Sequence, residues 1–515
     1  MRITFTVLLA LFVLATPTVR AQGASDAVKE FRRYFRTYKE TSEKVEAVRT
    51  LRSHDNAEAA QELMTLLDHK DEPIRAAAID VLSGFRDPKT FEAVVAELPN
   101  VKQNDRKALV IGVLGRSKVE AVVPVLTKLA TEDKKIDGQV RAAIARAFAD
   151  LGVKTAGPIL TTFLGDKDPM VRMAAADAAR ALQDRSVGPA LLPLIDDAAW
   201  QVQSAAVQAA GVLRIVEAID PLIAVMRGGG RLKEEAAEAL FRITAMDLPA
   251  DPDEWSRLLG KLRDAGWRPP TDEELAKAIE ARKKTDAFYG KQSDKTTFGG
   301  ITTTSTRVLF IIDVSGSMED RVIEIEKFQS GYANLQKLTI VKTELARTIE
   351  SLGPDVFFNI VAFASKLSTF KSDLVPANIV MKSAAKNWID KLQPIGGSEA
   401  QAAAAVGMSA TANLEAGKTN TYAALMYPFG IDPEKPPPPT TPGAIKNKLD
   451  TVFFLSDGRP SVGRLVDTNE IRKVVTKINE TYRIVFHCIA IGEFQKEFMG
   501  DLSRENGGVF VDLGR

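Results

Sequence analysis

The side chains of this 515-residue chain that could do chemistry gather in its second half, where apolar segments end. Asp313 closes one apolar run and Asp457 follows another, and the hydroxyls of Ser315 and Ser317 come two and four residues after the first carboxylate. Ligands of a parallel α/β sheet bind at the carboxyl ends of the strands. If the two runs are neighbouring strands, these oxygen-bearing side chains are candidates for holding a ligand at one sheet edge.

The segments that must position these residues have the pattern of a parallel sheet. Residues 307–312 form a continuous apolar run rich in β-branched side chains, which is typical of a strand buried on both faces. Similar runs occur at 356–363, 451–455 and 484–491, with helical patterns between them. Strands that alternate with helices predict a doubly wound α/β domain.

A third segment, Gly417-Lys418-Thr419-Asn420-Thr421, lies between the two acidic ones. Together the three resemble the metal-ion-dependent adhesion site of von Willebrand factor A domains. The family pattern is Asp-x-Ser-x-Ser, then a Thr in a Gly-Thr-Asn-like turn, then an Asp before Gly. The resemblance covers about residues 305 to 515 and implies a Rossmann-like α/β fold. It implies five metal ligands, namely Asp313, Ser315, Ser317, Thr419 and Asp457.

The ligand set implied by this resemblance suits a hard cation. Carboxylate and hydroxyl oxygens favour Mg²⁺, with Ca²⁺ or Mn²⁺ as alternatives. Three of the five groups are neutral hydroxyls, so the ion would stay electrophilic and keep one coordination position open. The Asp or Glu carboxylate of a protein partner could fill that position. We therefore expect a divalent-cation-dependent adhesion or scaffold protein, and not an enzyme.

The third segment departs from the family pattern. The Thr usually follows a Gly-Gly pair, whereas here Ser398 comes after Gly396-Gly397, and an Ala-rich stretch intervenes before Thr419. Either Thr419 returns to the metal after an excursion, or Ser398 takes its place. We favour Thr419, because the residues after it continue the family pattern.

Other interpretations of these residues lead to different functions. Ser315 and Ser317 could simply cap a helix, with Asp457 in a turn. A metal-dependent hydrolase is the enzymatic alternative, but it needs a base beside the activated water, and both aspartates are already used as ligands. A phosphate loop would require Gly at the place of Ala412. A third possibility is an assembly factor for a secreted complex, which the sequence does not separate from adhesion.

The first half of the chain is a repeat array. Similar Ala-rich segments begin at Val140, Val171 and Val202, at a constant spacing of 31 residues. Such helix pairs cannot bury their apolar stripes alone and therefore stack. The segments 71–75 and 168–172, each beginning with Asp, ending with Arg and containing a Pro between them, resemble HEAT-like repeats. We expect an α-solenoid whose concave face offers a second binding surface.

The N-terminus indicates export. Arg2 precedes an apolar run over residues 3–15, and small residues allow cleavage after Ala21. The run is too short to span a bilayer, and no later stretch could, so we expect a secreted or periplasmic protein without a membrane span after cleavage. The single cysteine, Cys488, excludes an intrachain disulfide and is expected in a buried strand, with His487 facing the opposite side.

Length and charge complete the predicted organisation. The 515 residues exceed what one core supports. With 68 basic and 67 acidic residues the chain lacks the basic excess of a nucleic-acid-binding protein. The predicted order is a signal peptide (1–21), a HEAT-like array (22–245), a connector (246–304) with two helical patterns, and a von Willebrand factor A domain (305–515).

Overall fold

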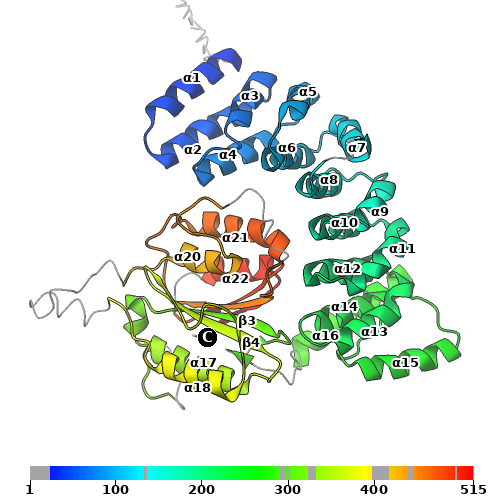
Figure 1. Cartoon of the computed structure of the whole chain (residues 1–515), viewed down its shortest axis with the longest axis vertical. Helices are drawn as coiled ribbons and strands as arrows, with labels where there is room; N and C mark the ends of the chain where they lie inside the picture. Colours follow the sequence, from blue (N-terminus) through cyan, green and yellow to red (C-terminus); the bar gives the residue numbers. More distant parts are fainter. Residues whose placement is uncertain are drawn as a thin grey trace, which may run out of the picture.

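The computed structural model describes residues 24–132, 136–289, 297–298, 301–322, 332–396, 417–437, 446–492 and 496–513. An arc of helices forms the first part of the chain, and an α/β domain lies within the concave side of the arc (Figure 1). Across these residues, no helix combines the length and the apolar character needed to cross a membrane. The predicted signal peptide, residues 1–21, lies outside the described residues.

The arc is a stack of helix pairs in which each inner helix packs on the next, as α6, α8, α10, α12 and α14 do in succession. The helices are α1 (Ala24–Thr37), α2 (Thr41–Arg49), α3 (Ala57–Thr65), α4 (Glu72–Ser83), α5 (Pro88–Glu97), α6 (Asn104–Arg116), α7 (Val123–Glu132), α8 (Gly138–Leu151), α9 (Gly157–Leu164), α10 (Pro169–Leu182), α11 (Gly188–Leu191), α12 (Trp200–Leu213), α13 (Ile219–Arg227), α14 (Leu232–Thr244), α15 (Pro252–Asp264) and α16 (Asp272–Tyr289). The repeat array predicted from the spacing is therefore a helical solenoid.

Small residues set the close spacing of the inner helices. A Cβ atom at Gly115 would lie 2.7 Å from the Cα atom of Ala147, and one at Gly211 would lie 2.7 Å from that of Ala239. Real Cβ atoms are not found at such distances from a neighbouring backbone, so these two helix contacts require glycine. The Ala-rich segments recognised in the sequence thus let successive repeats approach backbone to backbone.

The turns between repeats are fixed by a recurring ion pair. Arg172 donates two hydrogen bonds to the carboxylate of Asp197, at 2.7 and 2.8 Å. One repeat earlier, Arg141 donates in the same way to Asp166, at 2.6 and 3.0 Å. A bidentate arginine–carboxylate pair restricts both distance and orientation. Arg141 of α8 is thus tied to the turn before α10, and Arg172 of α10 is tied to the turn before α12.

The two helical patterns of the predicted connector are present as α15 and α16. Asp251 accepts hydrogen bonds from the backbone of Asp253 and Glu254 and so caps α15. Trp255 is fully buried and belongs to the same apolar core as the repeats. After α16, a small hairpin of β1 (Thr297–Phe298) and β2 (Ile301–Thr302) precedes the α/β domain.

The α/β domain contains a twisted sheet in the order β5-β4-β3-β7-β8-β9, with β6 paired to β4. The pairs β3–β4, β3–β7, β7–β8 and β8–β9 are parallel, whereas β5 and β6 run antiparallel to β4. The strands are β3 (Arg307–Asp313), β4 (Phe357–Phe363), β5 (Leu367–Thr369), β6 (Val375–Pro376), β7 (Thr451–Ser456), β8 (Val485–Ala490) and β9 (Phe510–Asp512). All four strands expected from apolar runs are confirmed.

Helices cover both faces of this sheet. Val308, Phe310 and Ile312 belong to one apolar core, together with side chains of α17 (Lys337–Ser351) and α18 (Ile379–Asp390). Leu309 and Ile311 belong to a second core with α20 (Thr421–Met426), α21 (Thr468–Tyr482) and α22 (Lys496–Glu505). Alternate residues of one strand thus face opposite cores, as expected for a doubly wound domain.

Candidate metal centre

The two aspartates singled out in the sequence lie at the same edge of the sheet. Asp313 is the last residue of β3, and Asp457 directly follows β7. The two strands are parallel neighbours, with Ile312 opposite Leu455, so their carboxyl ends coincide. Both aspartates are buried, with exposed fractions of 0% and 2%.

Hydrogen bonds join the first segment to the second. The Ser315 amide donates to Asp313 Oδ1 at 2.8 Å, and the Oγ atoms of Ser315 and Ser317 are 3.3 Å apart. Ser317 Oγ then donates to Asp457 Oδ1 at 2.8 Å. The Ser315 side chain makes no capping bond to the short helix Gly316–Glu319. The hydroxyls therefore point into the carboxylate cluster and do not serve as a local helix cap.

Thr419 reaches the same cluster from the loop before α20. Its amide donates to Ser461 Oγ at 2.9 Å, and the next amide, of Asn420, donates to the Ala364 carbonyl at 2.9 Å. Asn420 also caps α20, because its Oδ1 accepts from the amide of Ala423 at 3.1 Å. These bonds anchor the loop on both sides of Thr419, which is 5% exposed.

Gly458 shows how closely the three segments converge. A Cβ atom at this position would lie 3.2 Å from Thr419 Oγ1, 3.5 Å from Ser317 Oγ and 3.6 Å from Asp313 Oδ2. One point is thus surrounded by oxygens from three separate parts of the chain. A side chain at residue 458 would crowd this space, which glycine leaves open.

The two carboxylates of the cluster disfavour each other's ionised form. Burial, and secondly the nearby charge of Asp457, raises the pKa of the Asp313 carboxyl to about 7. Ser456 Oγ donates to Asp313 Oδ2 at 2.5 Å and partly offsets this effect. Two buried carboxylates that share hydroxyl neighbours are costly without positive charge between them. A divalent cation would remove this cost.

Lys337, the first residue of α17, supplies one positive charge to the cluster. Its Nζ atom lies 2.6 Å from Asp457 Oδ2, 3.4 Å from the Ser317 carbonyl oxygen and 3.9 Å from Asp320 Oδ2. Sequence reasoning missed this residue as well as Ser456. A lysine at a helix N-terminus is electrostatically unfavourable, which was the available signal that a carboxylate lies nearby.

The donor set fits a hard cation better than a soft one. Among the described residues, no group of three or more His, Cys, Asp and Glu side chains could hold a metal ion. An ion here would depend on hydroxyl oxygens in addition to the two carboxylates, as Mg²⁺ and Ca²⁺ accept. The structure brings Asp313, Ser315, Ser317, Thr419 and Asp457 together, whereas the alternative ligand Ser398 lies outside the described residues.

The only histidine and cysteine of the described α/β domain have structural surroundings. His487 stacks on Phe453 with a centroid distance of 4.9 Å, and its Nδ1 accepts from the amide of Val509 at 3.1 Å. Burial lowers the pKa of His487 to about 4. Cys488 is fully buried in the opposite core, so the two side chains face opposite sides of β8, as predicted.

Comparison with known proteins gives matches to parts of the chain. A family model of HEAT repeats matches residues 39–100, 135–211 and 159–241. Inter-alpha-trypsin inhibitor heavy chain H2 of Homo sapiens is 26% identical over 206 residues, which is 39% of this chain and 17% of that protein. Heavy chain H4 of Bos taurus is 25% identical over 212 residues, 41% of this chain and 18% of that protein. The chain therefore spans less than a fifth of the length of these relatives.

Solved structures give weaker likenesses. The conserved hypothetical protein BatB from Bacteroides thetaiotaomicron aligns with 40% of this chain and 88% of its own, at a TM-score of 0.25 and 12% identity. The complex of CpcE and CpcF of phycocyanin lyase from Nostoc sp. aligns with 50% of this chain and 100% of its own, at a TM-score of 0.26 and 16% identity. The family model thus supports HEAT repeats, and the curated relatives support a partial similarity to the heavy chains.

Proposed function

We propose that the α/β domain is a von Willebrand factor A domain whose adhesion site binds a divalent cation, Mg²⁺ first, and through it a protein partner. The observation that carries the proposal is the convergence of Thr419, Ser317 and Asp313 oxygens within 3.6 Å of one point beside Gly458. Similarity to heavy chains of an inter-alpha-trypsin inhibitor supports a protein-binding role.

The five residues would have two different roles when an ion is bound. The carboxylates of Asp313 and Asp457 would balance its charge, and the hydroxyls of Ser315, Ser317 and Thr419 would complete its shell without neutralising it. The bound ion would be an electrophile that attracts an anionic oxygen. An Asp or Glu side chain of the partner is the matching group, and the five residues of this chain fix where that carboxylate must arrive.

We also propose that the protein acts outside the cytoplasm. A basic residue, an apolar run and small residues before Gln22 favour export, which leads to the periplasm or the medium. Free Mg²⁺ or Ca²⁺ and a secreted protein partner would meet the site there. We propose a binding role and no catalysis, because both aspartates would be engaged as ligands.

The test is capture of partner proteins that depends on the metal and on Asp457. Immobilised full-length protein is exposed to extracellular proteins of its source in Mg²⁺ or in a chelator. We expect a bound protein that is released by the chelator and is not captured by Asp457→Ala. Asp264→Ala is the matched control, since it removes an exposed carboxylate at the end of α15, outside the α/β domain.

The captured protein then provides the sharper experiment. Exchange of its acidic contact residue for the corresponding amide should abolish binding, because an amide is a much poorer ligand for a hard cation. Capture that is equal in chelator and in Mg²⁺, with Asp457→Ala as effective as the parent, would refute a metal-dependent adhesion function.

A further inference from the structure

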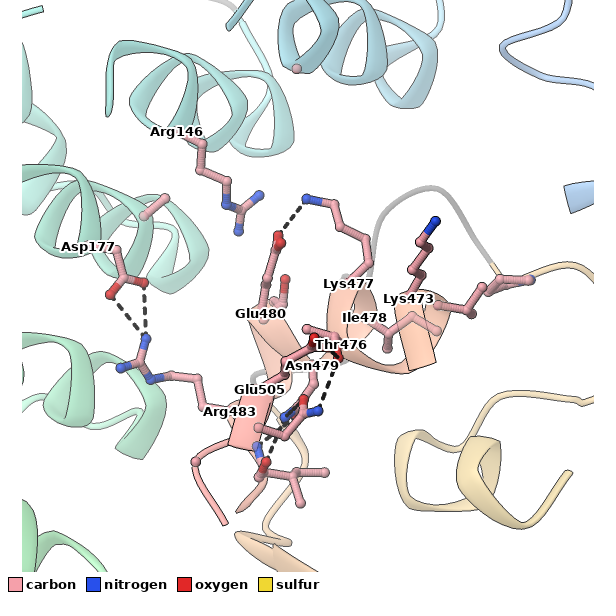
Figure 2. Close-up of a pocket in the computed structure, with 18 of the residues that line it drawn as sticks. Arg146, Asp177, Lys473, Thr476, Lys477, Ile478, Asn479, Glu480, Arg483 and Glu505 are labelled. Carbon is pink, nitrogen blue, oxygen red and sulfur yellow. Dashed lines mark hydrogen bonds and ion pairs between the residues drawn. The ribbon is translucent and has the colours of Figure 1, made fainter. Parts of the chain in front are cut away.

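The concave face of the helical array is in contact with the chain's own α/β domain. Arg483, the residue after α21, extends its guanidinium onto α10 and α12 (Figure 2). Its Nη1 atom lies 3.1 and 3.0 Å from the two carboxylate oxygens of Asp177. Its Nη2 donates to Gln208 Oε1 at 2.7 Å, and its Nε donates to Ser204 Oγ at 3.3 Å. The arginine side chain is only 10% exposed.

The residues that contact Arg483 recur at the spacing of the repeat. Asp177 and Gln208 occupy the same position in successive repeats, 31 residues apart, and Arg146 occupies it one repeat earlier. These three form a polar row along the concave face, with a positive, a negative and a neutral member. The end of α21 presents Glu480 and Arg483 to this row, and Arg146 points toward Glu480 in Figure 2. The charges of the two surfaces are therefore complementary.

A second group of contacts lies beside the first and involves the backbone of the α/β domain. Trp200 Nε1 and Gln201 Nε2 both donate to the Asn447 carbonyl oxygen, each at 3.0 Å. Arg231 donates to the carbonyl oxygens of Asp450, at 3.3 Å, and Arg483. These side chains satisfy backbone acceptors that precede β7 and β8, so the array holds the amino ends of the strands.

The docked arrangement leaves the carboxyl edge of the sheet away from these contacts. Asp450 directly precedes β7, whereas Asp457 directly follows it. Arg231, directly before α14, contacts the carbonyls that precede β7 and β8, and β3 runs parallel to β7. The amino ends of these strands therefore face the array, and the strands run from there to the opposite edge. The array therefore orients the candidate metal centre outward relative to α12 and α14.

The interface is polar and only partly packed. A cavity of about 1690 Å³ remains between the array and α21, and it is lined by charged side chains of both signs, including Arg116, Arg146, Lys473, Glu470 and Glu480. The apolar cores of the array and of the α/β domain are separate clusters. Such an interface resembles a specific but separable protein–protein contact more than a shared core.

We propose that the concave face of the array is a docking surface whose occupant is this chain's own α/β domain, with Arg483 on Asp177 and Gln208 as the specifying contact. An outside protein then cannot use this part of the concave face while the domain is docked. The array serves to hold and orient the domain. This inference does not depend on metal binding, so it can fail or hold separately from the proposed function.

The test is a charge exchange across the interface in the full-length protein. Asp177→Arg and Arg483→Asp should each increase the radius of gyration in small-angle scattering. Each should also accelerate amide hydrogen exchange of α21 and of the inner side of α12 by about tenfold or more, because both then open locally. The double variant Asp177→Arg/Arg483→Asp should restore protection, since the ion pair is re-formed with reversed polarity.

Controls keep the result interpretable. Arg263→Asp reverses the charge of a half-exposed residue of α15 that pairs with Asp220, and it should leave both measurements at the parent values. Asp177→Asn tests the contact with a milder change if a charge reversal fails to fold. Single variants with parental scattering and exchange would overturn the proposal. A particle size that grows with protein concentration would also overturn it, because the domain would then dock on a second copy.

Discussion

Binding of a divalent cation should weaken steeply as the pH falls below 7, and Asp313 is the reason. This carboxyl is fully buried, and burial together with the charge of Asp457 raises its pKa to about 7. A metal ion binds the carboxylate and not the carboxylic acid, so below pH 7 the ion must first displace a proton. An ordinary aspartate, which titrates near 3.8, would cause no such dependence in this range.

The size of the effect follows from the titration. Each pH unit below the pKa costs about a factor of ten in apparent affinity, or about 1.36 kcal/mol. Between pH 8 and pH 5 the affinity for Mn²⁺ should therefore fall by roughly 100-fold, and above pH 8 it should level off. Calorimetric titrations in two buffers of different ionisation enthalpy should detect about half a proton released per ion near pH 7.

In the metal-free protein, the same pKa shift should make the stability of the fold depend on pH. The folded state raises the pKa of Asp313, so the protonated carboxyl favours the folded state. This contribution to the free energy of unfolding is complete below pH 4 and is lost as the pH rises through 7. The loss is on the order of 4 kcal/mol, and Asp313→Asn should remove this part of the pH dependence of the melting temperature. A metal affinity that is independent of pH, with no proton release, would refute the reasoning.

Three further predictions concern the cluster and the chain's processing. Lys337→Met should raise the affinity for Mn²⁺ by about tenfold, because the ammonium 2.6 Å from Asp457 Oδ2 competes with the ion, whereas Lys337→Arg should stay near the parent value; calorimetry that shows weaker binding for the methionine variant would contradict this. Thr419→Ala should reduce partner capture more than metal affinity, and Ser398→Ala should change neither; the reverse pattern in paired binding assays would transfer the ligand role to Ser398. N-terminal sequencing of the exported protein should begin at Gln22 or within a few residues of it, and an intact N-terminus would exclude cleavage.

The sequence predicted those parts of the structure that depend on periodicity and on strand ends. The spacing of 31 residues predicted stacked helix pairs, and the buried run 307–312 predicted a central strand. Asp313 and Asp457 could be placed at one edge because parallel neighbouring strands end together. These inferences need only local patterns and general rules of α/β topology.

The parts that escaped prediction arise from contacts between distant segments. Lys337 meets Asp457 across 120 residues, and no local pattern specifies this pairing. Arg483 meets Asp177 across 306 residues, and this contact depends on the curvature of the array. Curvature results from small rotations summed over many repeats. The repeat sequence therefore does not predict which part of the α/β domain will contact the concave face. The third-loop assignment rests on the placement of Thr419, and Ser398 lies outside the described residues.

We propose that Asp313, with Ser315, Ser317, Thr419 and Asp457, holds a divalent cation. The most direct measurement is a calorimetric titration of Mn²⁺ and of Mg²⁺ into the full-length protein and into Asp313→Ala at pH 8, where the carboxyl is ionised. We expect one bound ion for the parent, loss of binding for the variant, and the same circular dichroism spectrum for both. An Asp313→Ala protein that binds the ions as tightly as the parent would show that these residues do not hold the ion.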